Sequence, residues 1–240
     1  MSTRRVYLPP GSIAGERARL TGEASHYLRG VLRLRPGDEV EVFDGSGGAW
    51  RGTLGEGDQV ALGPRREAPR PGGRVWLAFA LAKGEKSDLV AQKATELGVE
   101  RLLPFAAERS VVALDSRRAA ARVARWRRIA AEAARQCGRA DVPEVDAPAP
   151  LGAALGEVPA GFRLLVFHAA GGEPLAEAVA RAAAGHFLVV GPEGGLAPVE
   201  VEACLAAGGR LASLGPRVLR AETAAMVAVA LVQHLAGDAG

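Results

Sequence analysis

Hydrophobic and polar residues alternate in short runs through the first seventy residues. Residues 39–43 and 50–54 are typical of β-strands, and the Asp-Gly-Ser-Gly-Gly segment at 44–48 predicts the turn of a hairpin between them. Residues 26–34 predict a short helix instead. The apolar positions on one side of this helix are Tyr27, Val31 and Leu34. The pattern therefore predicts a small β-rich barrel with one short helix.

Residues 64–74 are rich in proline, glycine and arginine and predict a linker. After this linker the predicted elements alternate between strands and helices. Strands are predicted at 75–82, 101–105, 163–167, 186–190 and 210–214. Helices are predicted at 85–97, 117–137, 173–183, 198–206 and 221–235. Continuous apolar strands that alternate with helices favour an α/β domain with a largely parallel sheet. We therefore expect two domains, at residues 1–70 and 74–240.

The long helix predicted at 117–137 has two distinct faces. A stripe at three- and four-residue spacing predicts its buried side: Ala119, Val123, Trp126, Ala130, Ala133 and Cys137. Arginines occupy another face: Arg117, Arg128, Arg135 and Arg139. These arginines either hold phosphates or simply solvate the helix.

Charge is unevenly distributed along the 240 residues, although the net charge is only +3. Residues 101–142 carry 10 basic and 4 acidic side chains, and residues 143–240 carry 5 and 10. A basic middle segment is what a polyanion would bind, and a solvated surface is the alternative. No stretch of eighteen apolar residues and no signal peptide is present, so we expect a cytoplasmic protein without a membrane span. Cys137 and Cys204 match no zinc-site spacing and are expected to be buried thiols, and no metal site is expected.

Two loops carry the candidate chemistry. Gly-Pro-Glu-Gly-Gly at 191–195 follows an apolar strand, and Glu193 would oppose a bound pyrophosphate, so a nucleoside without phosphates fits better than a dinucleotide. Residues 213–223 bring Arg217, Arg220 and Glu222 together beside a glycine turn. A plain strand-to-helix turn and helix capping by Glu222 and Thr223 are the alternatives. Neither loop contains a nucleophilic cysteine or a Ser/His pair, which leaves group transfer from a bound donor.

Both loops resemble the paired C-terminal signatures of the ribosomal RNA small-subunit methyltransferase E family, within the SPOUT superfamily. The segments that carry the resemblance are GPEGG (191–195), LGPRVLRAET (214–223), QKATELGV (92–99), ERSVV (108–112), RWRRIAAEAARQCGR (125–139) and HYLRGVLRLRPGDEVEVFDG (26–45). Cys137 departs from the serine expected there. The resemblance covers nearly the whole chain.

The resemblance implies an α/β fold with an N-terminal PUA-like RNA-binding β-barrel and a C-terminal SPOUT domain that contains a deep trefoil knot. It further implies a homodimer that uses S-adenosylmethionine to methylate N3 of a uridine in small-subunit (16S) ribosomal RNA. The implied cofactor-binding residues are Phe167, His168, Gly191, Pro192, Glu193, Gly194, Gly195, Ser213, Leu214, Gly215, Leu219, Arg220 and Thr223.

The chemistry of uridine N3 assigns further roles. Arg220 and Arg217 are the catalytic candidates, because they can stabilise the anion that forms when N3 loses its proton. Glu222 is the nearest general base, although a cap at an exposed helix start is favoured for it. The RNA-binding candidates are Arg29, Arg33, Arg128, Arg135 and Arg139. A ribose 2′-O methyltransferase and a non-catalytic RNA-binding or ribosome-assembly module are the alternatives.

Overall fold

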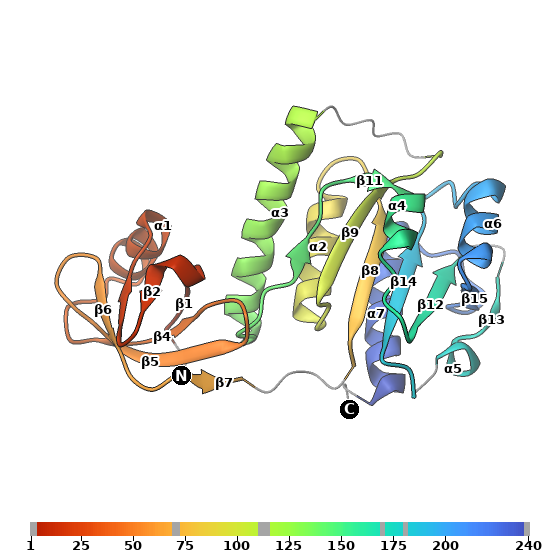
Figure 1. Ribbon diagram of the computed structural model, residues 1–240. Helices are drawn as coiled ribbons and strands as arrows, with labels where there is room; N and C mark the ends of the chain where they lie inside the picture. Colours follow the sequence, from red (N-terminus) through yellow and green to blue (C-terminus); the bar gives the residue numbers. More distant parts are fainter. Residues whose placement is uncertain (1–3, 69–72, 110–115, 169–170, 180–181, 238–240) are drawn as a thin grey trace. The chain divides into compact units, whose positions relative to one another are not determined.

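The computed structural model divides the chain into two compact units (Figure 1). The residues that it describes are 4–68, 73–109, 116–168, 171–179 and 182–237. The first unit comprises Met1–Arg70 and Ala131–Val142, and the second comprises Pro71–Ala130 and Pro143–Gly240. The end of the long helix thus groups with the first unit, whereas the sequence assigned it to the second.

The first unit is built on one sheet. Its strands are β1 (Arg5–Tyr7), β2 (Ile13–Ala14), β3 (Arg17–Arg19), β4 (Glu39–Phe43), β5 (Gly48–Leu54), β6 (Gln59–Leu62) and β7 (Arg66–Glu67). They follow the order β1-β4-β5-β6-β3-β2, with β7 beside β5. The predicted hairpin is confirmed: β4 and β5 are antiparallel, with Phe43 opposite Ala49. β7 lies inside the expected linker, because its two residues pair with Gly48 and Ala49.

The helix predicted at 26–34 begins earlier than expected, and its predicted apolar face is confirmed at Leu34, which is buried, and at Tyr27, which packs against the core, but is wrong at Val31. A short α1 (Gly22–Ser25) begins earlier, where the Thr21 hydroxyl accepts a hydrogen bond from Ala24 N at 3.2 Å, and a π-helical η2 (His26–Val31) follows. The wider i to i+5 turn, in which Leu32 N donates to Tyr27 O, rotates the inward face. Leu28 is therefore fully buried, while Val31 is 60% exposed.

The last turns of the long helix α3 (Ser116–Cys137) are fixed within the first unit. Arg5 is almost fully buried, and its guanidinium donates to Glu41 Oε1 at 2.6 Å and to Arg139 O at 3.1 Å. The Arg135 guanidinium lies 4.0 Å from the centre of the Tyr27 ring. The end of α3 is therefore held by Arg5 of β1, whose guanidinium also donates to Ala134 O at 3.5 Å, and by Tyr27 of η2.

The second unit is a parallel sheet. Its strands are β8 (Val75–Ala80), β9 (Arg101–Ala106), β10 (Glu144–Val145), β11 (Ala149–Pro150), β12 (Phe162–Phe167), β13 (Glu173–Pro174), β14 (Gly185–Val190) and β15 (Arg210–Ser213). The order is β10-β9-β8-β14-β12-β15-β13, with β11 beside β9. Every strand pair in this sheet is parallel, as predicted.

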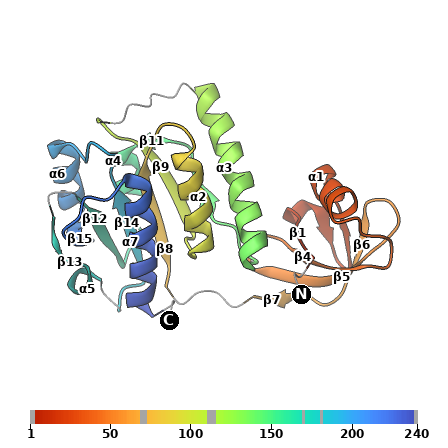
Figure 2. The same ribbon diagram turned by 180° about the vertical axis from the view of Figure 1, so that it is seen from behind.

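Helices cover both faces of the second sheet (Figures 1 and 2). The described helices of this unit, besides α3, are α2 (Lys86–Glu96), α4 (Leu151–Gly156), α5 (Leu175–Ala178), α6 (Pro198–Ala206) and α7 (Ala221–Ala236). Alternate strand residues such as Phe105 and Val166 pack in a core with Leu151 of α4 and Cys204 of α6. α2 and α7 contact each other, and α7 contacts β8 and β14. Burial of both faces explains the continuous apolar strands.

The helix predicted at 173–183 is confirmed only at Leu175–Ala178 (α5), and its residues 180 and 181 lie outside the described part of the chain. Glu173 and Pro174 instead pair with Ala212 and Ser213 of β15, so α5 starts only at Leu175. It ends at Ala178, because Val179 is extended with φ −71° and ψ 125°. The alanine-rich sequence has helical propensity, but strand pairing overrides it at the start of the segment.

The buried stripe of α3 is confirmed at four positions and wrong at its end. Val123, Trp126, Ala130 and Ala133 are buried. Trp126 meets Phe79 edge to face at 6.1 Å between ring centres. Cys137 is exposed, in contrast to the expected buried thiol, and Cys204 is buried. Burial raises the pKa of the Cys204 thiol to about 11. No described helix is long and apolar enough to cross a membrane.

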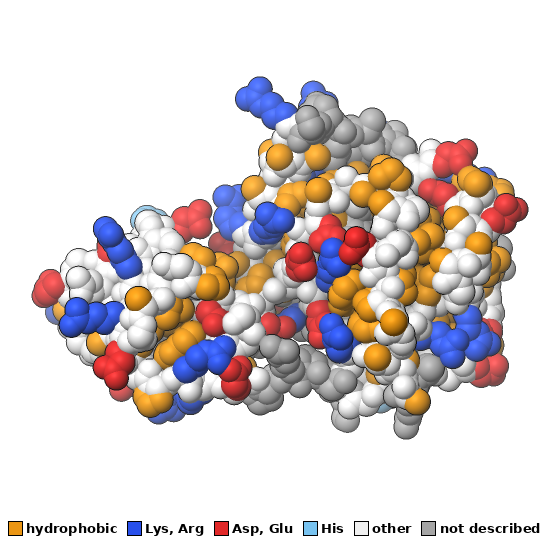
Figure 3. Space-filling model, viewed as in Figure 1, with side chains coloured by type: hydrophobic (Ala, Val, Ile, Leu, Met, Phe, Trp, Pro, Cys, Tyr) orange, Lys and Arg blue, Asp and Glu red, His pale blue; other side chains and the backbone are white. Residues whose placement is uncertain are grey.

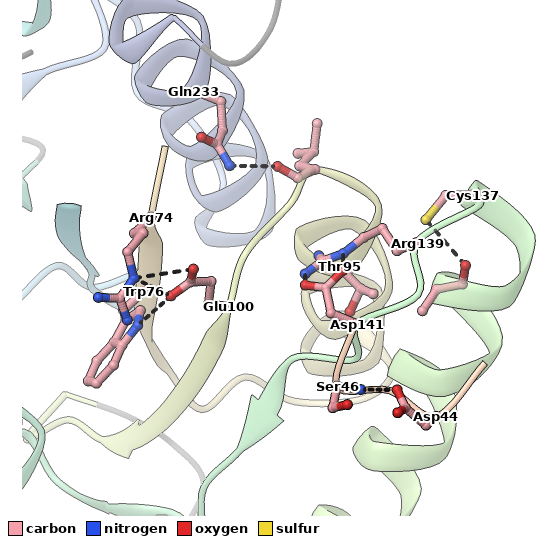
Figure 4. A network of polar contacts seen from close by, with 12 residues as sticks. Asp44, Ser46, Arg74, Trp76, Thr95, Glu100, Cys137, Arg139, Asp141 and Gln233 are labelled. Carbon is pink, nitrogen blue, oxygen red and sulfur yellow. Dashed lines mark hydrogen bonds and ion pairs between the residues drawn. The ribbon is translucent and has the colours of Figure 1, made fainter. Parts of the chain in front are cut away.

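Polar contacts fix the amino-terminal edge of the second sheet (Figure 4). Glu100 accepts hydrogen bonds from Arg74 Nε at 3.0 Å and from Trp76 Nε1 at 3.3 Å. On α7, Gln233 Nε2 donates to Leu97 O at 3.2 Å. These contacts stabilise the edge opposite the strand ends that form the candidate site.

Candidate active site

Three neighbouring parallel strands end at the same edge of the second sheet. β14, β12 and β15 lie in that spatial order, and their carboxyl ends are Val190, Phe167 and Ser213. Ligands of open α/β sheets bind beyond the carboxyl ends of the strands. The loops after these three strands are therefore the place to look for a site.

The loop after β14 is a tight glycine turn. A Cβ on Gly191 would lie 2.9 Å from Leu196 Cγ and 3.1 Å from Leu196 N, so a side chain there would force the turn open. Gly195 has φ +70°, which favours glycine, and its N–H donates to Pro192 O at 2.8 Å. A Cβ built on Gly195 would point toward His168 Nε2 at 4.0 Å. The glycines thus give the loop its shape and leave its backbone accessible.

The loop after β15 turns at Gly215, whose φ is +102°. Gly215 N donates to Ser213 Oγ at 3.1 Å, which closes the turn. The chain then runs exposed through Arg217 and Val218 to Arg220, the N-cap of α7. The short connection positions both arginines next to the loop that follows β14.

A pocket lies between these loops. The predicted cofactor-binding residues that line it are Phe167, His168, Gly191, Pro192, Glu193, Gly195, Ser213, Leu214, Gly215 and Leu219. The catalytic candidate Arg217 also lines it. Further lining residues, which the sequence did not single out, are Gly171, Val190, Ala212, Val218, Ala221 and Ala224. This lining is largely apolar with accessible backbone, which fits a flat, uncharged ring such as adenine.

Three predicted cofactor-binding residues lie outside this lining. Gly194 faces away, since its carbonyl accepts a hydrogen bond from Arg109 Nη1 at 3.2 Å. Arg220 is exposed at the N-cap of α7, and Thr223 is half-buried in the first turn. The structure therefore separates Arg220 from the pocket wall, although it follows Leu219 directly.

A charged cluster adjoins the pocket. Lys86 at the start of α2 forms an ion pair with Glu193 of the glycine loop. The hydrogen bond between them raises the pKa of Lys86 and lowers the pKa of Glu193. The nearby Glu222 carboxylate also helps raise the pKa of Lys86. Sequence reasoning missed Lys86, because 107 positions separate it from Glu193.

Glu222 occupies a different environment from the exposed helix start that the sequence suggested. Its Oε2 atom is buried and has no hydrogen-bond partner among the described residues. The side chain lines a small cavity with Lys86, Ser87 and Gly191, next to the pocket but distinct from it. Glu222 therefore lies at the small cavity that Gly191 of the glycine loop also lines and is not among the residues that line the pocket.

Glu200 joins two loops at the same edge, a role that the sequence analysis did not identify. It is buried, and its carboxylate accepts hydrogen bonds from Ala197 N at 2.8 Å and from Glu108 N at 3.0 Å. The first bond caps α6, and the second fixes the segment after β9. A glutamate three residues after a helix start indicated the cap but not the second contact.

The RNA-binding candidates fall into two groups. Arg33 and Arg128 are exposed, and Figure 3 shows basic side chains along α3. The other three make contacts inside the first unit. Arg29 donates to Gly55 O at 2.8 Å, Arg135 stacks on Tyr27, and the largely buried Arg139 pairs with Asp141 at 2.5 Å (Figure 4). These three have structural roles in the first unit.

Family models match both parts of the chain. An RNA methyltransferase PUA domain matches residues 20–62, and an RNA methyltransferase domain matches residues 68–233. The chain is also 37% identical over 134 residues to ribosomal RNA small subunit methyltransferase E of Bacillus subtilis, an alignment that covers 52% of this chain and 51% of that protein. In such alignments the chain spans about half the length of the curated relatives it matches, 51% and 48% for the first two.

Solved structures match over nearly the full length. A ribosomal RNA small subunit methyltransferase E from Neisseria gonorrhoeae, bound to S-adenosyl methionine, is 30% identical, with a TM-score of 0.87 over 97% of this chain and 98% of that one. A protein from Legionella pneumophila in complex with the cofactor SAM is also 30% identical, with a TM-score of 0.89 and 98% of both chains covered.

Proposed function

The chain belongs to the ribosomal RNA small subunit methyltransferase E family, and we propose that it transfers a methyl group from S-adenosylmethionine to N3 of a uridine in small-subunit (16S) ribosomal RNA. The observation that carries this proposal is the pocket at the carboxyl ends of β14, β12 and β15, formed by the two glycine loops. Full-length similarity to a structure solved with S-adenosyl methionine supports it.

The pocket lining suits the adenosine part of the cofactor. Apolar side chains such as Leu214 and Leu219 pack against a flat ring, and the glycine loops offer backbone N–H and C=O groups for its polar edge. Lys86 compensates the charge of Glu193, so the acidic side chain of the loop adds little net negative charge to the site. When bound, the cofactor supplies an electrophilic methyl group.

The role proposed for the arginines is to stabilise the anion that forms when N3 of uridine loses its proton. Neutral uracil carries hydrogen on N3, so the nitrogen attacks only as that proton is lost to solvent water and the negative charge of the resulting imide anion spreads onto O2 and O4. Arg217 and Arg220 donate hydrogen bonds to such an oxygen as charge develops, and the exposed position of both side chains in the short segment beside the pocket supports this role. Glu222 faces Lys86 behind the loop, which supports a positioning role for it rather than a role as general base.

We assign the RNA contact to the basic faces of the protein. The first unit acts as a PUA-like RNA-binding barrel at residues 1–70, and Arg128 and Arg33 are exposed enough to reach phosphates. Arg29, Arg135 and Arg139 support the surface indirectly by holding the first unit together.

The remaining features follow from family membership. We extend the proposal to residues 74–240 as the methyltransferase domain with a deep trefoil knot; the strand order β14-β12-β15, in which β14 and β15 lie on opposite sides of β12, is compatible with it. Two copies associate through exposed apolar surface that includes Val218 of the pocket lining, 81% exposed, and Leu231 farther along α7, 40% exposed. The protein acts in the cytoplasm on ribosomal RNA.

Calorimetry with S-adenosylhomocysteine tests the cofactor assignment. We expect the folded protein to bind one molecule per chain, and folded protein that does not bind would contradict the proposal. A non-catalytic RNA-binding module would bind RNA without methyl transfer, and a ribose 2′-O enzyme would give a different methylated nucleoside.

A further inference from the structure

Arg109 contacts the glycine loop at a residue that does not line the pocket. It follows β9 in the chain, and its Nη1 atom donates a hydrogen bond to Gly194 O at 3.2 Å. The Arg109 side chain is exposed, and neither Arg109 nor Gly194 belongs to the pocket lining. The two residues are 85 positions apart, so the local sequence did not indicate the contact. Arg109 therefore holds the loop from outside the pocket.

The hydrogen bond fixes the orientation of the peptide between Gly194 and Gly195. The described residues contain no cis peptide bond, so the C=O of Gly194 and the N–H of Gly195 point in opposite directions. That N–H donates to Pro192 O at 2.8 Å, which closes the turn of the loop. A rotation of the peptide plane would break both hydrogen bonds at once. Arg109 thus stabilises the turn although it contacts only the carbonyl.

The flanking residues give this peptide little restraint of their own. Glycine lies on both sides of it, and glycine adopts positive and negative φ almost equally readily. Gly195 has φ +70° and lines the pocket. Earlier in the loop, the ring of Pro192 restricts its own φ, and Glu193 is held by its ion pair with Lys86. The Gly194–Gly195 peptide is therefore the part of the loop that depends on a contact from another segment.

The segment that carries Arg109 is itself fixed. Glu108 N donates to Glu200 Oε1 at 3.0 Å, and the other oxygen of this buried carboxylate accepts from Ala197 N at 2.8 Å. Ala197 is the N-cap of α6, which follows the glycine loop closely. The backbone beside Arg109 is thus anchored to the residues that follow the loop. This anchor lets Arg109 hold Gly194 O in one place.

We propose that Arg109 is a positioning residue for the cofactor, because its hydrogen bond holds the Gly194–Gly195 peptide in the orientation that completes the pocket. The proposal rests on the proposed function and deepens it, since it assigns part of the cofactor affinity to a side chain outside the pocket lining. Without this side chain the peptide rotates more freely. Only the fraction of molecules with the correct orientation then binds the cofactor, which lowers the apparent affinity.

Calorimetry with S-adenosylhomocysteine on Arg109→Ala tests the proposal. We expect the affinity to fall by about three- to tenfold, the effect of losing one hydrogen bond. Arg109→Lys keeps a donor and should lose less. In methylation assays, KM for S-adenosylmethionine should rise by a similar factor while kcat at saturating cofactor stays unchanged, because the bound state is the same. A general defect in folding would lower kcat instead.

A second substitution separates the orientation of the peptide from other effects of Arg109. Gly194→Ala restricts the backbone beside the peptide, and its methyl group has room, since the nearest atom is Arg109 Cβ at 3.5 Å, which alanine at position 109 keeps. We expect Arg109→Ala/Gly194→Ala to bind S-adenosylhomocysteine about two- to fivefold more tightly than Arg109→Ala, because alanine removes conformations that glycine allows. In the presence of Arg109 the peptide is already held, so Gly194→Ala alone gains nothing.

The matched control is Arg127→Ala. Arg127 is an exposed arginine of α3 in the same unit, and its Nη2 atom donates to Val145 O at 2.9 Å, away from the pocket lining. The control should bind S-adenosylhomocysteine as the wild type does. Wild-type affinity in Arg109→Ala, an equal loss in the control, or a loss that Gly194→Ala does not relieve would overturn the role of Arg109 and leave the proposed function intact. Failure of the wild-type protein to bind S-adenosylhomocysteine would instead contradict the proposed function.

Discussion

Lys86 at the start of α2 forms an ion pair with Glu193 in the glycine loop after β14. The pair connects the glycine loop, which lines the pocket, to the neighbouring helix α2. Both side chains are partly exposed, at 38% and 47%, so solvent screens their attraction. We expect Lys86→Met to weaken binding of S-adenosylhomocysteine by no more than about fivefold, an effect that fades at high salt.

Lys93→Met is the control for this change, because Lys93 lies on the same helix and pairs with Glu96 at 2.8 Å, away from the pocket. Calorimetry should show wild-type affinity for it. Equal losses in the two variants would mean that the Lys86 pair does not act on the loop.

The same pair predicts how cofactor binding depends on pH. Lys86 lowers the pKa of Glu193. The stabilisation of the folded loop by the ionised Glu193 carboxylate is therefore fully present above the ordinary pKa of 4.5 and is lost as the pH falls through the lower folded pKa. Glu193 raises the pKa of Lys86. The stabilisation of the folded loop by the protonated Lys86 amine is therefore fully present below the ordinary pKa of 10.5 and is lost as the pH rises through the higher folded pKa. Any effect of Lys86→Met on affinity should therefore be constant between these limits and shrink in acid; an effect that changes near pH 7 would contradict this assignment.

Gly191 and Gly194 of the glycine loop differ in the space available for a side chain. Gly191→Ala introduces a methyl group 2.9 Å from Leu196 Cγ and close to the backbone, which should displace the loop and reduce S-adenosylhomocysteine affinity by roughly ten- to a hundredfold. At Gly194 the nearest atom to a new Cβ is Arg109 Cβ at 3.5 Å, so Gly194→Ala should bind normally. Calorimetry on both variants decides; equal affinities would show that the turn at Gly191 does not shape the site.

Glu200 should stabilise the fold near the site. Glu200→Ala leaves the buried N–H group of Ala197 and the part-buried N–H group of Glu108 without their acceptor, at a cost of about 1–3 kcal/mol in the free energy of unfolding. Glu200→Gln keeps one acceptor oxygen and should lose less. Urea denaturation measures both, and an alanine variant as stable as wild type would show that other groups satisfy these donors.

Arg220 tests the catalytic proposal. We expect Arg220→Ala to fold and to bind S-adenosylhomocysteine, because the side chain is exposed and lies outside the pocket lining. Methyl transfer should fall by about a hundredfold or more, as when one donor to a developing oxyanion is removed. The deficit should be partly relieved at high pH, where uridine ionises unaided. Normal turnover, or a defect in cofactor binding alone, would assign Arg220 to structure or to the methionine carboxylate.

Much of the second unit could be predicted because its elements have strong local signals. The apolar run of β14, the start of α6 at Pro198 and the stripe of Trp126 and Ala130 each identify one element. Short elements were missed where tertiary contacts decide the outcome. β13 forms only because Glu173 and Pro174 pair with β15, and the π-helical turn at η2 moves burial from Val31 to Leu28.

In the candidate site, too, local motifs could be predicted and tertiary contacts could not. The glycines that bend the two loops were visible as sequence motifs, and the family resemblance that they carried is confirmed. The ion pair of Lys86 and the second contact of Glu200 could not be predicted, because they join residues 107 and 92 positions apart. The environment of Glu222 also depends on the neighbouring helix α2, which a reading of the loop alone does not include.

The central claim is methyl transfer to N3 of uridine, and the nucleoside produced tests it most directly. Isolated small ribosomal subunits and naked ribosomal RNA are incubated with the protein and isotopically labelled S-adenosylmethionine, and the digested nucleosides are separated and identified by mass spectrometry. We expect the label in N3-methyluridine from at least one of the two substrates. Label in a 2′-O-methylated nucleoside, or no labelled nucleoside from protein that binds the cofactor, would contradict the claim.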